Sequence, residues 1–509
     1  MQITPLEYIT KYLRLEETKL ITEIIPANPF ITSKHSSLEK AMEEAKSYRE
    51  WKEAALALDK LEGKDRWRLD PKYAGYDCHL LKSRIQLFRK LRKQKDYEQL
   101  IFRLREELHG NIGNMANPAL YQESRAGTKK LVNDYLDEVS ASLNLLCDSK
   151  LESLPTMRKR RFIKRTARGF GRSALMLSGG ASLGLFHLGV IKELLAEGIL
   201  PRVITGSSAG SIVAGILATH TDDELQKLIE PDQMNFEWFR MFGLVEIIKG
   251  EGVADQKLLQ KFINANILDM TFLQAYQHTS RIINISLSPT DTHQFPRLLN
   301  YLTAPNVLIR RAVLASSAVP GLFPPVKLRA RNYAGKSVAY MPRSSWVDGS
   351  IHGDIPKDKI NRLHNINHYI VSQTNPHIVP FMNKEIRKNG LVPFIQDVIL
   401  KAPMIQLEHL LGLIHQHFEI PGLDSIIKKA HAVISQTYSG DITVYPERHL
   451  SNIGKVFSNP DTEQIEKMIL AGKRATWPQI ERIRNTTQIS RTLDHCLQRM
   501  SERFVYVER

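Results

Sequence analysis

A serine at the centre of a short motif is the first candidate for chemistry in this chain of 509 residues. The motif GSSAG spans Gly206 to Gly210, with Ser208 in the middle and apolar runs on both sides. A serine in a tight turn from strand to helix is typical of a nucleophile elbow, where small neighbours let the two backbones approach. Its oxygen then lies at a helix N-terminus, where N–H groups favour negative charge. We expect Ser208 to be a nucleophile; a glycine-rich turn that only packs or binds phosphate is the alternative.

A second glycine-rich segment lies upstream of this motif. An apolar run leads into SGGASLG, which contains Gly179, Gly180, Ala181 and Gly184 and precedes a helix-like stretch. Successive N–H groups in such a loop can bind a phosphate or an oxyanion. The glycine spacing does not fit a dinucleotide fingerprint, and no acidic residue follows at the end of a second strand. We therefore expect an oxyanion-binding loop beside the serine.

Asp348 is the candidate base. It follows the apolar pair Trp346–Val347 and precedes Gly349 and Ser350. A hydroxyl is a weak nucleophile until a base accepts its proton, and a carboxylate at a strand end can do so. Asp-Gly is also common in ordinary turns, so this feature indicates little by itself.

The elements that would position these residues alternate between strand and helix from about residue 173 to 375. This alternation predicts an α/β domain over residues 173–375, with a mostly parallel sheet and helices on both faces. Strands are expected at Ala174–Leu177, Arg202–Thr205, Arg281–Ser286, Trp346–Val347 and Tyr369–Ser372. Helices are expected directly after the first two.

The flanking regions have a different pattern. Residues 1–165 are highly charged with apolar residues at helical spacing, which predicts a helical N-terminal extension. Residues 376–509 are expected to be mainly helical, with one further strand near Asp441–Tyr445.

The formal net charge of +16 indicates an anionic partner surface, without choosing which one. A basic run from Arg158 to Arg168 could attract anionic lipid head groups at ~1 kcal/mol per residue, or could be a solvated helix. Nucleic acid ranks last, because no nucleic-acid-binding signature accompanies the run. Val392–Ile420 is a second candidate for membrane contact, with a buried helix pair as the alternative.

Cys78, Cys147 and Cys496 are far apart in the chain and have no metal or disulfide spacing, so we expect a reducing compartment and no metal. The first residues lack an apolar segment, which predicts no secretory signal. The uncharged stretches Ala174–Ile191 and Val203–Thr219 are broken by glycine and serine, so we expect buried units and no transmembrane helix. These features favour an intracellular protein that is cytoplasmic or peripheral on a lipid surface.

Together, GSSAG, SGGASLG and VDGS resemble the patatin-like phospholipase family over residues 173–372, including ASSAVPGLFPPV between Ala315 and Val326. The resemblance implies an α/β fold and a dyad in which Ser208 is the nucleophile and Asp348 the base. It also implies an oxyanion loop at Gly179, Gly180 and Ala181, and no cofactor. The family usually has glycine at position 181 and glycine or alanine at position 350.

The N-terminal region, including HGNIGNMANPALY, is similar to the extension of fungal and plant triacylglycerol lipases in this family. The resemblance implies triacylglycerol hydrolysis through an acyl-enzyme, with phospholipase A or lysophospholipase activity as the alternative. A triad with His352 or His377 is a mechanistic rival. A catalytically silent lipid-binding scaffold is the alternative of another class. The sequence does not indicate the oligomeric state.

Overall fold

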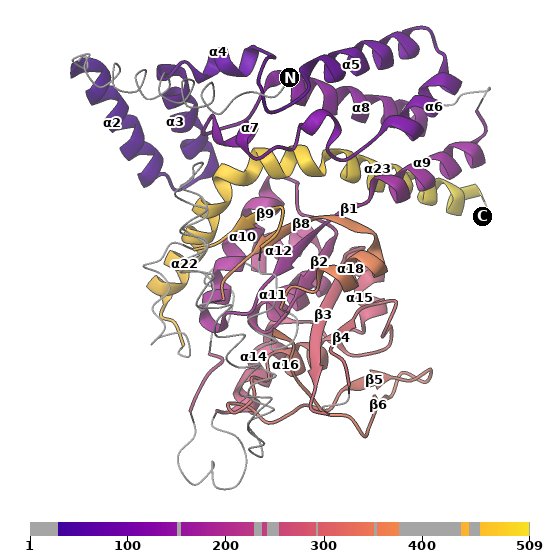
Figure 1. The fold of residues 1–509 in the computed structure, drawn as a ribbon. Coiled ribbons are helices and arrows are strands. Elements are labelled where there is room, and N and C mark those ends of the chain that lie inside the picture. The colour runs from indigo at the N-terminus through magenta and orange to yellow at the C-terminus, as the bar shows by residue number, and fades with distance from the viewer. Residues whose placement is uncertain are drawn as a thin grey trace, which may run out of the picture.

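The computed structural model describes residues 29–149, 154–228, 237–241, 254–291, 294–350, 354–375, 439–446 and 459–507. Within these ranges, a layer of helices lies above a sheet-containing layer, and a C-terminal helix runs between the two (Figure 1). The lower layer carries Ser208, Asp348 and the glycine loop, so its sheet is described first.

The described part of the lower layer is built on a seven-stranded sheet, with a separate two-stranded hairpin. The strand order is β4-β3-β2-β1-β8-β9, and β7 also pairs with β3. β1, β2, β3, β8 and β9 are parallel, whereas β4 and β7 run antiparallel to β3. The strands are β1 (Arg172–Leu177), β2 (Val203–Gly206), β3 (Ile282–Pro289), β4 (Arg297–Leu299), β7 (Trp346–Asp348), β8 (Ile366–Ser372) and β9 (Ile442–Val444); β5 (Arg329–Arg331) and β6 (Ser337–Ala339) form the hairpin.

The parallel strands form because their residues are apolar on both faces. β1, β2 and β3 are buried along almost their whole length, as expected when helices cover both sides of a sheet. The predicted strands are all confirmed, including the one near Asp441–Tyr445. β4, β5 and β6 were not predicted; each is three residues long and contains no run of apolar residues with a readable alternation.

The register brings three loops to one edge of the sheet. Leu177 of β1 lies opposite Gly206 of β2 on one side and opposite Ser372 of β8 on the other. In an open parallel sheet, ligands bind beyond the carboxyl ends of the strands. The segments that follow these three residues therefore meet where a site is expected.

Helices cover both faces of this sheet (Figure 1). The helices in order are α10 (Leu185–Ala196), α11 (Ala209–Thr219), α12 (Asp222–Leu228), α14 (Gln256–Asn266), α15 (Phe272–Thr279), α16 (Ile309–Ser316) and α18 (Lys357–His364), and the short 3-10 helix η2 spans Ala181–Gly184. α10 and α11 are buried on nearly every side, which explains why α11 has no charged residue and α10 has only Lys192 and Glu193. Within the described ranges, no helix combines the length and apolar character of a membrane span.

The upper layer is helical, as predicted. Its helices are α2 (Pro29–Glu44), α3 (Tyr48–Leu61), α4 (Lys64–Leu69), α5 (Cys78–Lys93), α6 (Tyr97–Glu107), α7 (Ala119–Gln122), α8 (Lys130–Asp148) and α9 (Thr156–Phe170), with the 3-10 helix η1 at Ile112–Asn114. Ser47, Asp77 and Asp96 cap α3, α5 and α6 by accepting hydrogen bonds from N–H groups of the first turn. The basic run from Arg158 to Arg168 lies in α9, where its cations are exposed apart from the buried Lys159.

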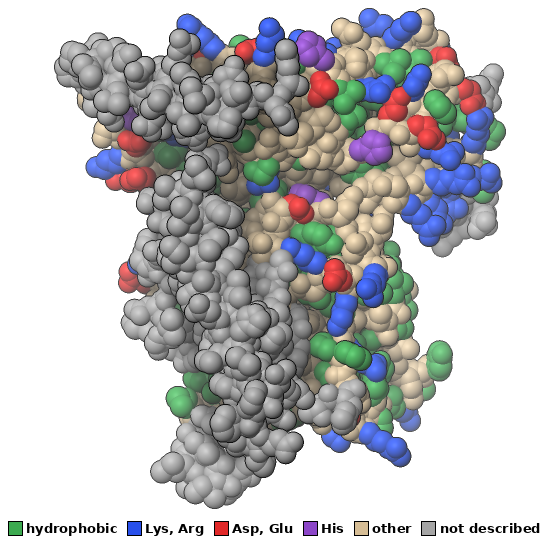
Figure 2. All heavy atoms as spheres, in the orientation of Figure 1, with side chains coloured by type: hydrophobic (Ala, Val, Ile, Leu, Met, Phe, Trp, Pro, Cys, Tyr) green, Lys and Arg blue, Asp and Glu red, His purple; other side chains and the backbone are tan. Residues whose placement is uncertain are grey.

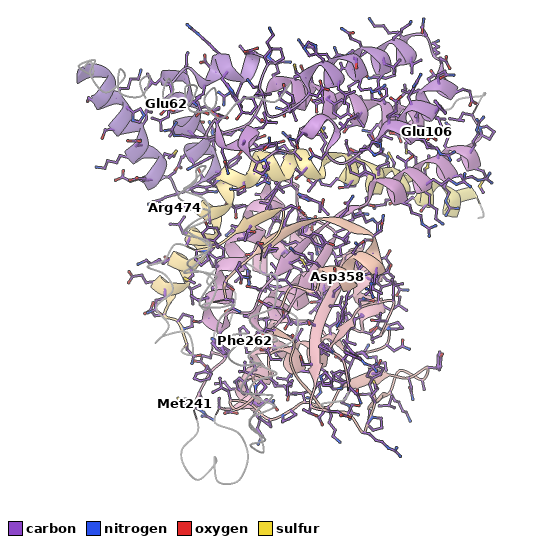
Figure 3. All side chains as sticks on the ribbon, in the orientation of Figure 1. Glu62, Glu106, Met241, Phe262, Asp358 and Arg474 are labelled. Atoms are coloured by element: carbon purple, nitrogen blue, oxygen red, sulfur yellow. The ribbon has the colours of Figure 1, made fainter. Side chains whose placement is uncertain are left out.

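The C-terminal helices join the two layers. α22 (Thr462–Thr476) packs on α10, and α23 (Ile480–Val507) continues from it through the 3-10 helix η5 (Trp477–Gln479). Arg474 donates to the Ala45 carbonyl at 3.0 Å and lies at the junction of the layers in Figure 3. On α23, Leu493 and Met500 are buried in the core of the upper layer. Cys147 and Cys496 are free thiols that meet between α8 and α23, where Cys147 donates to the Cys496 carbonyl at 3.6 Å.

Candidate active site

Ser208 lies in the sharp turn between β2 and α11. Its φ of 50° and ψ of −125° are strained for a residue with a side chain, which the surrounding structure must hold in place. Its N–H donates to Ser316 Oγ at 3.1 Å, and its carbonyl accepts from Ser211 Oγ at 2.6 Å. A Cβ added at Gly206 would collide with the Gly210 carbonyl, and one at Gly210 with the Leu177 carbonyl. Glycine is therefore required at both ends of the motif.

Asp348 ends β7 and is nearly fully buried. Its N–H donates to the Ala318 carbonyl at 3.0 Å, and its Oδ1 accepts from the Ser350 N–H at 2.8 Å. A Cβ on Gly349 would collide with the Ser286 carbonyl, so glycine is needed for the strand to end here. The antiparallel pairing of β7 with β3 brings this carboxyl to the edge where Ser208 lies.

Burial raises the pKa of the Asp348 carboxyl to about 6, and hydrogen bonds from the Ser350 N–H and the Ser208 hydroxyl oppose that rise. Asp348 Oδ2 makes no hydrogen bond of standard geometry with the described residues. The Ser208 hydroxyl is near the Asp348 carboxyl but makes no hydrogen bond of standard geometry with its Oδ2.

The glycine loop lies directly against Ser208. A Cβ on Gly179 would stand 3.2 Å from Ser208 Cβ and 3.3 Å from Ser350 Cβ, so this loop can approach only because it lacks side chains. Gly184 is equally close to the elbow, because its added Cβ would be 2.7 Å from Ala209 Cβ. Ala181 has a φ of 48°, a left-handed conformation that glycine adopts more readily.

The donors of this loop are not equivalent. The Gly179 N–H already donates to Asp354 Oδ1 at 2.8 Å. No described residue accepts a hydrogen bond from the N–H of Gly180 or Ala181. Of the three residues expected to bind an oxyanion, the last two therefore have N–H groups available, whereas that of Gly179 holds the loop in place.

His187 supports the loop from α10 and was not predicted. It is fully buried, and its Nε2 lies 3.0 Å from the Ser178 carbonyl while its Nδ1 lies 2.7 Å from Ser372 Oγ. Burial lowers the pKa of this imidazole to about 4, so it is neutral at physiological pH. Because a carbonyl can only accept, the proton is on Nε2 and the Ser372 hydroxyl donates to Nδ1. The only signal in the sequence was a histidine within an otherwise apolar helix.

Asp354 is a second buried carboxyl that sequence reasoning missed. It accepts from the Gly179 N–H and from Ser207 Oγ, each at 2.8 Å. The signal in the sequence was another acid shortly after Asp348, in GDIP.

An apolar cavity opens beside Ser208, and the space between its walls is about 710 Å³ when the part open to solvent is included. Figure 3 labels Phe262, which lines the cavity from α14. The walls come from four helices and the loops between them, and include Leu185, Leu188, Ile212, Val213, Ile216, Leu259, Val319 and Phe323.

The histidines of the rival triad, His352 and His377, lie outside the described residues. Among the residues that the structure describes, no histidine forms a hydrogen bond with Ser208 or Asp348. The same residues contain no cluster of His, Cys, Asp and Glu that could hold a metal ion.

Comparisons with known proteins identify the fold of both layers. Residues 175–358 match the family described as patatin-like phospholipase, and residues 30–168 match a domain of unknown function (DUF3336). Triacylglycerol lipase ptl2 of Schizosaccharomyces pombe is 33% identical over 479 residues, which are 90% of this chain and 74% of that protein. The chain belongs to the patatin-like phospholipase family.

Other patatin-like relatives align over most of this chain. Triacylglycerol lipase ptl3 of Schizosaccharomyces pombe is 34% identical, with 87% of this chain and 93% of that protein covered. Triacylglycerol lipase SDP1L of Arabidopsis thaliana is 34% identical over 90% of this chain, which spans only 58% of the plant protein. The resemblance inferred from the sequence is confirmed, and the family places this chain among the carboxylic ester hydrolases.

Proposed function

We propose that this patatin-like protein is a lipase that cleaves fatty-acyl esters of glycerolipids, with triacylglycerol as the first candidate substrate. The observation that carries the proposal is the position of Ser208, in a strained elbow at the wall of an apolar cavity and next to a buried carboxyl. An apolar wall suits an acyl chain, because burying methylene groups is favourable at ~0.8 kcal/mol each. The names of the relatives support a neutral glycerolipid.

In the proposed mechanism, Ser208 Oγ attacks the ester carbonyl while Asp348 accepts its proton. The N–H groups of Gly180 and Ala181 stabilise the oxyanion, and losing one such donor typically costs ~10²–10³ in rate. The alcohol leaves with a proton, and water then releases the fatty acid from the acyl-enzyme. A pKa of about 6 suits Asp348 to this role, because the carboxyl is ionised at neutral pH and still basic enough to accept a proton.

Substrate choice is tested by offering purified protein triacylglycerol, monoacylglycerol and phospholipid side by side, with Ser208→Ala as the blank. We expect fatty-acid release from triacylglycerol to be fastest and to be lost in the variant. Faster release from phospholipid or lysophospholipid would support the phospholipase alternative.

The silent scaffold is tested by labelling with a fluorophosphonate probe. We expect the wild-type protein to be labelled and Ser208→Ala to remain unlabelled, because the probe reacts with an activated serine. Folded wild-type protein that is not labelled would support the scaffold.

The dyad is tested against the triad with His352→Ala and His377→Ala. Near-normal turnover in both variants supports the dyad. A large loss of turnover in either variant, with the fold intact, would support a triad.

Contact with a lipid surface is the last part of the proposal. The opposite side of α9 buries Phe162, Ile163 and Phe170, so its basic side faces outward. Four exposed cations of α9 have no ion pair to any described residue: Arg161, Lys164, Arg165 and Arg168, which we call the basic face of α9. Figure 2 shows Lys and Arg side chains gathered over this part of the molecule. Val392–Ile420, the other candidate segment, lies outside the described residues.

A further inference from the structure

We propose that Asp354 is a positioning residue that ties the oxyanion loop to the nucleophile elbow. The inference rests on the proposed serine–aspartate mechanism. It adds a function for a buried carboxyl that neither touches the ester nor accepts the serine proton.

The first support is geometric. Asp354 Oδ1 accepts from the Gly179 N–H at 2.8 Å and from Ser207 Oγ at 2.8 Å. The hydroxyl of Ser207 also lies 2.7 Å from the Asp354 carbonyl. Gly179 follows β1 and Ser207 follows β2, which are neighbouring parallel strands. One carboxyl oxygen therefore bridges the two loops that must stay in register around the reacting carbonyl.

The second support is the strain at the elbow. Ser208 has a positive φ, and such a conformation persists only where neighbouring contacts hold it. Ser316 holds its N–H from one side, and Asp354 holds the preceding residue, Ser207, from the other. Without Asp354, the elbow and the loop would each be free to relax, and small misplacements of reacting groups cost large factors in rate.

The third support is the charge of the neighbourhood. Asp354 is buried, and burial raises its pKa to about 7, with the charge of Asp348 adding to the rise. The other described groups in contact with it, Gly179, Ser207 and Asn375, are neutral. Burial raises the pKa of both carboxyls, and the charge of Asp348 disfavours a charge on Asp354, so the pair ionises in two steps as pH rises.

The ionisation of both carboxyls should lower the rate at alkaline pH. As pH rises, the pair takes on a second negative charge next to the loop that must stabilise an oxyanion. The rate should therefore rise with the first ionisation of the pair and fall with the second. In Asp354→Asn the amide oxygen can accept both hydrogen bonds, and the second ionisation is absent.

The test uses the full chain with Asp354→Asn, Asp354→Ala and Ser207→Ala. An exposed acid on α18, Asp358, which is labelled in Figure 3, provides the matched control Asp358→Asn. The measurements are kcat and KM for a water-soluble ester between about pH 5 and 9, the rate of fluorophosphonate labelling, and the thermal midpoint of each variant.

We expect Asp354→Ala to lose about 10²–10³ in kcat with little change in KM, because positioning acts on the transition state. Asp354→Asn should stay within about tenfold of wild type near pH 6.5 and lose the fall in rate above about pH 7. Ser207→Ala should lose less than Asp354→Ala, and the two changes should not be additive. Asp358→Asn should match wild type throughout.

Unchanged kcat in folded Asp354→Ala would overturn the positioning role. An Asp354→Asn profile that keeps the alkaline fall would contradict the effect of the second ionisation, and a loss as deep as that of Asp354→Ala would show that the two hydrogen bonds are not what positions the loop. If Asp354→Ala does not fold, Asp354→Asn alone decides through its pH profile. Full activity of Ser208→Ala would instead reject the proposed mechanism itself, so the two failures are distinguishable.

Discussion

At the scale of single residues, the buried charge of Asp348 lowers the stability of the folded protein at neutral pH. Its folded pKa of about 6 lies above the ordinary value of 3.8, because burial disfavours its charge. The folded protein therefore holds this proton more tightly than the unfolded chain. As a result, the free energy of unfolding falls as pH rises from about 4 to about 6, and the loss stays complete above that range.

Asp348→Asn should remove this loss of stability and should also abolish hydrolysis. We expect the variant to be more stable than wild type by roughly 1–3 kcal/mol at pH 7.5, and no more stable below about pH 4. Urea unfolding at both pH values measures the difference, with Asp358→Asn as an exposed control. A variant that is less stable at pH 7.5 would contradict the assignment of burial as the main cause.

At the scale of elements, α10 and α22 meet through glycine. A Cβ on Gly472 would collide with the Phe186 carbonyl, and one on Gly189 with the Ile469 carbonyl. α10 carries His187, which supports the glycine loop, so this contact links the C-terminal region to the site.

Gly472→Ala should push α22 away from α10. We expect a loss of ~1–3 kcal/mol in the free energy of unfolding, which is typical of overpacking. Gly169→Ala is a matched control, because Gly169 lies in α9 with open space around it and should gain ~0.5–1 kcal/mol from helix propensity. Thermal or urea unfolding should show changes of opposite sign in the free energy of unfolding of the two variants, if α10 and α22 are as close as described.

At the scale of the whole molecule, the charge is unevenly placed, and the basic face of α9 is its clearest concentration (Figure 2). Arg158, at the start of the same helix, is paired with Glu98 and is not part of this face. An anionic lipid surface would be attracted to the unpaired cations, and salt would screen the attraction.

Arg161→Glu combined with Arg165→Glu should weaken binding to anionic vesicles by at least about tenfold, since each cation contributes ~1 kcal/mol near the surface. Vesicle flotation at low and high salt measures the change. Lys336→Glu with Arg343→Glu, two exposed cations near the β5–β6 hairpin, is the matched control. An equal loss of vesicle binding in the two double variants, or binding that does not weaken at high salt, would argue against the basic face of α9 as the docking surface.

The sequence by itself determined the features that depend on neighbours along the chain. GSSAG and VDGS place Ser208 and Asp348 at strand ends, because the sterics of a tight turn depend on adjacent residues. The apolar runs next to the motifs predicted the parallel strands, because a strand that is buried on both faces needs a continuous run of apolar residues. These features also carried the family resemblance. The pairing of the two residues as a catalytic dyad remains a prediction.

Only the tertiary structure decided which distant side chains meet. Asp354 contacts Gly179 across 175 positions, and Cys147 contacts Cys496 across 349, although their spacing in the chain suggested no relation. α23 was expected to be helical, but not to supply core residues to the upper layer. Such contacts depend on how buried surfaces from remote segments fit together, and no local pattern encodes that fit.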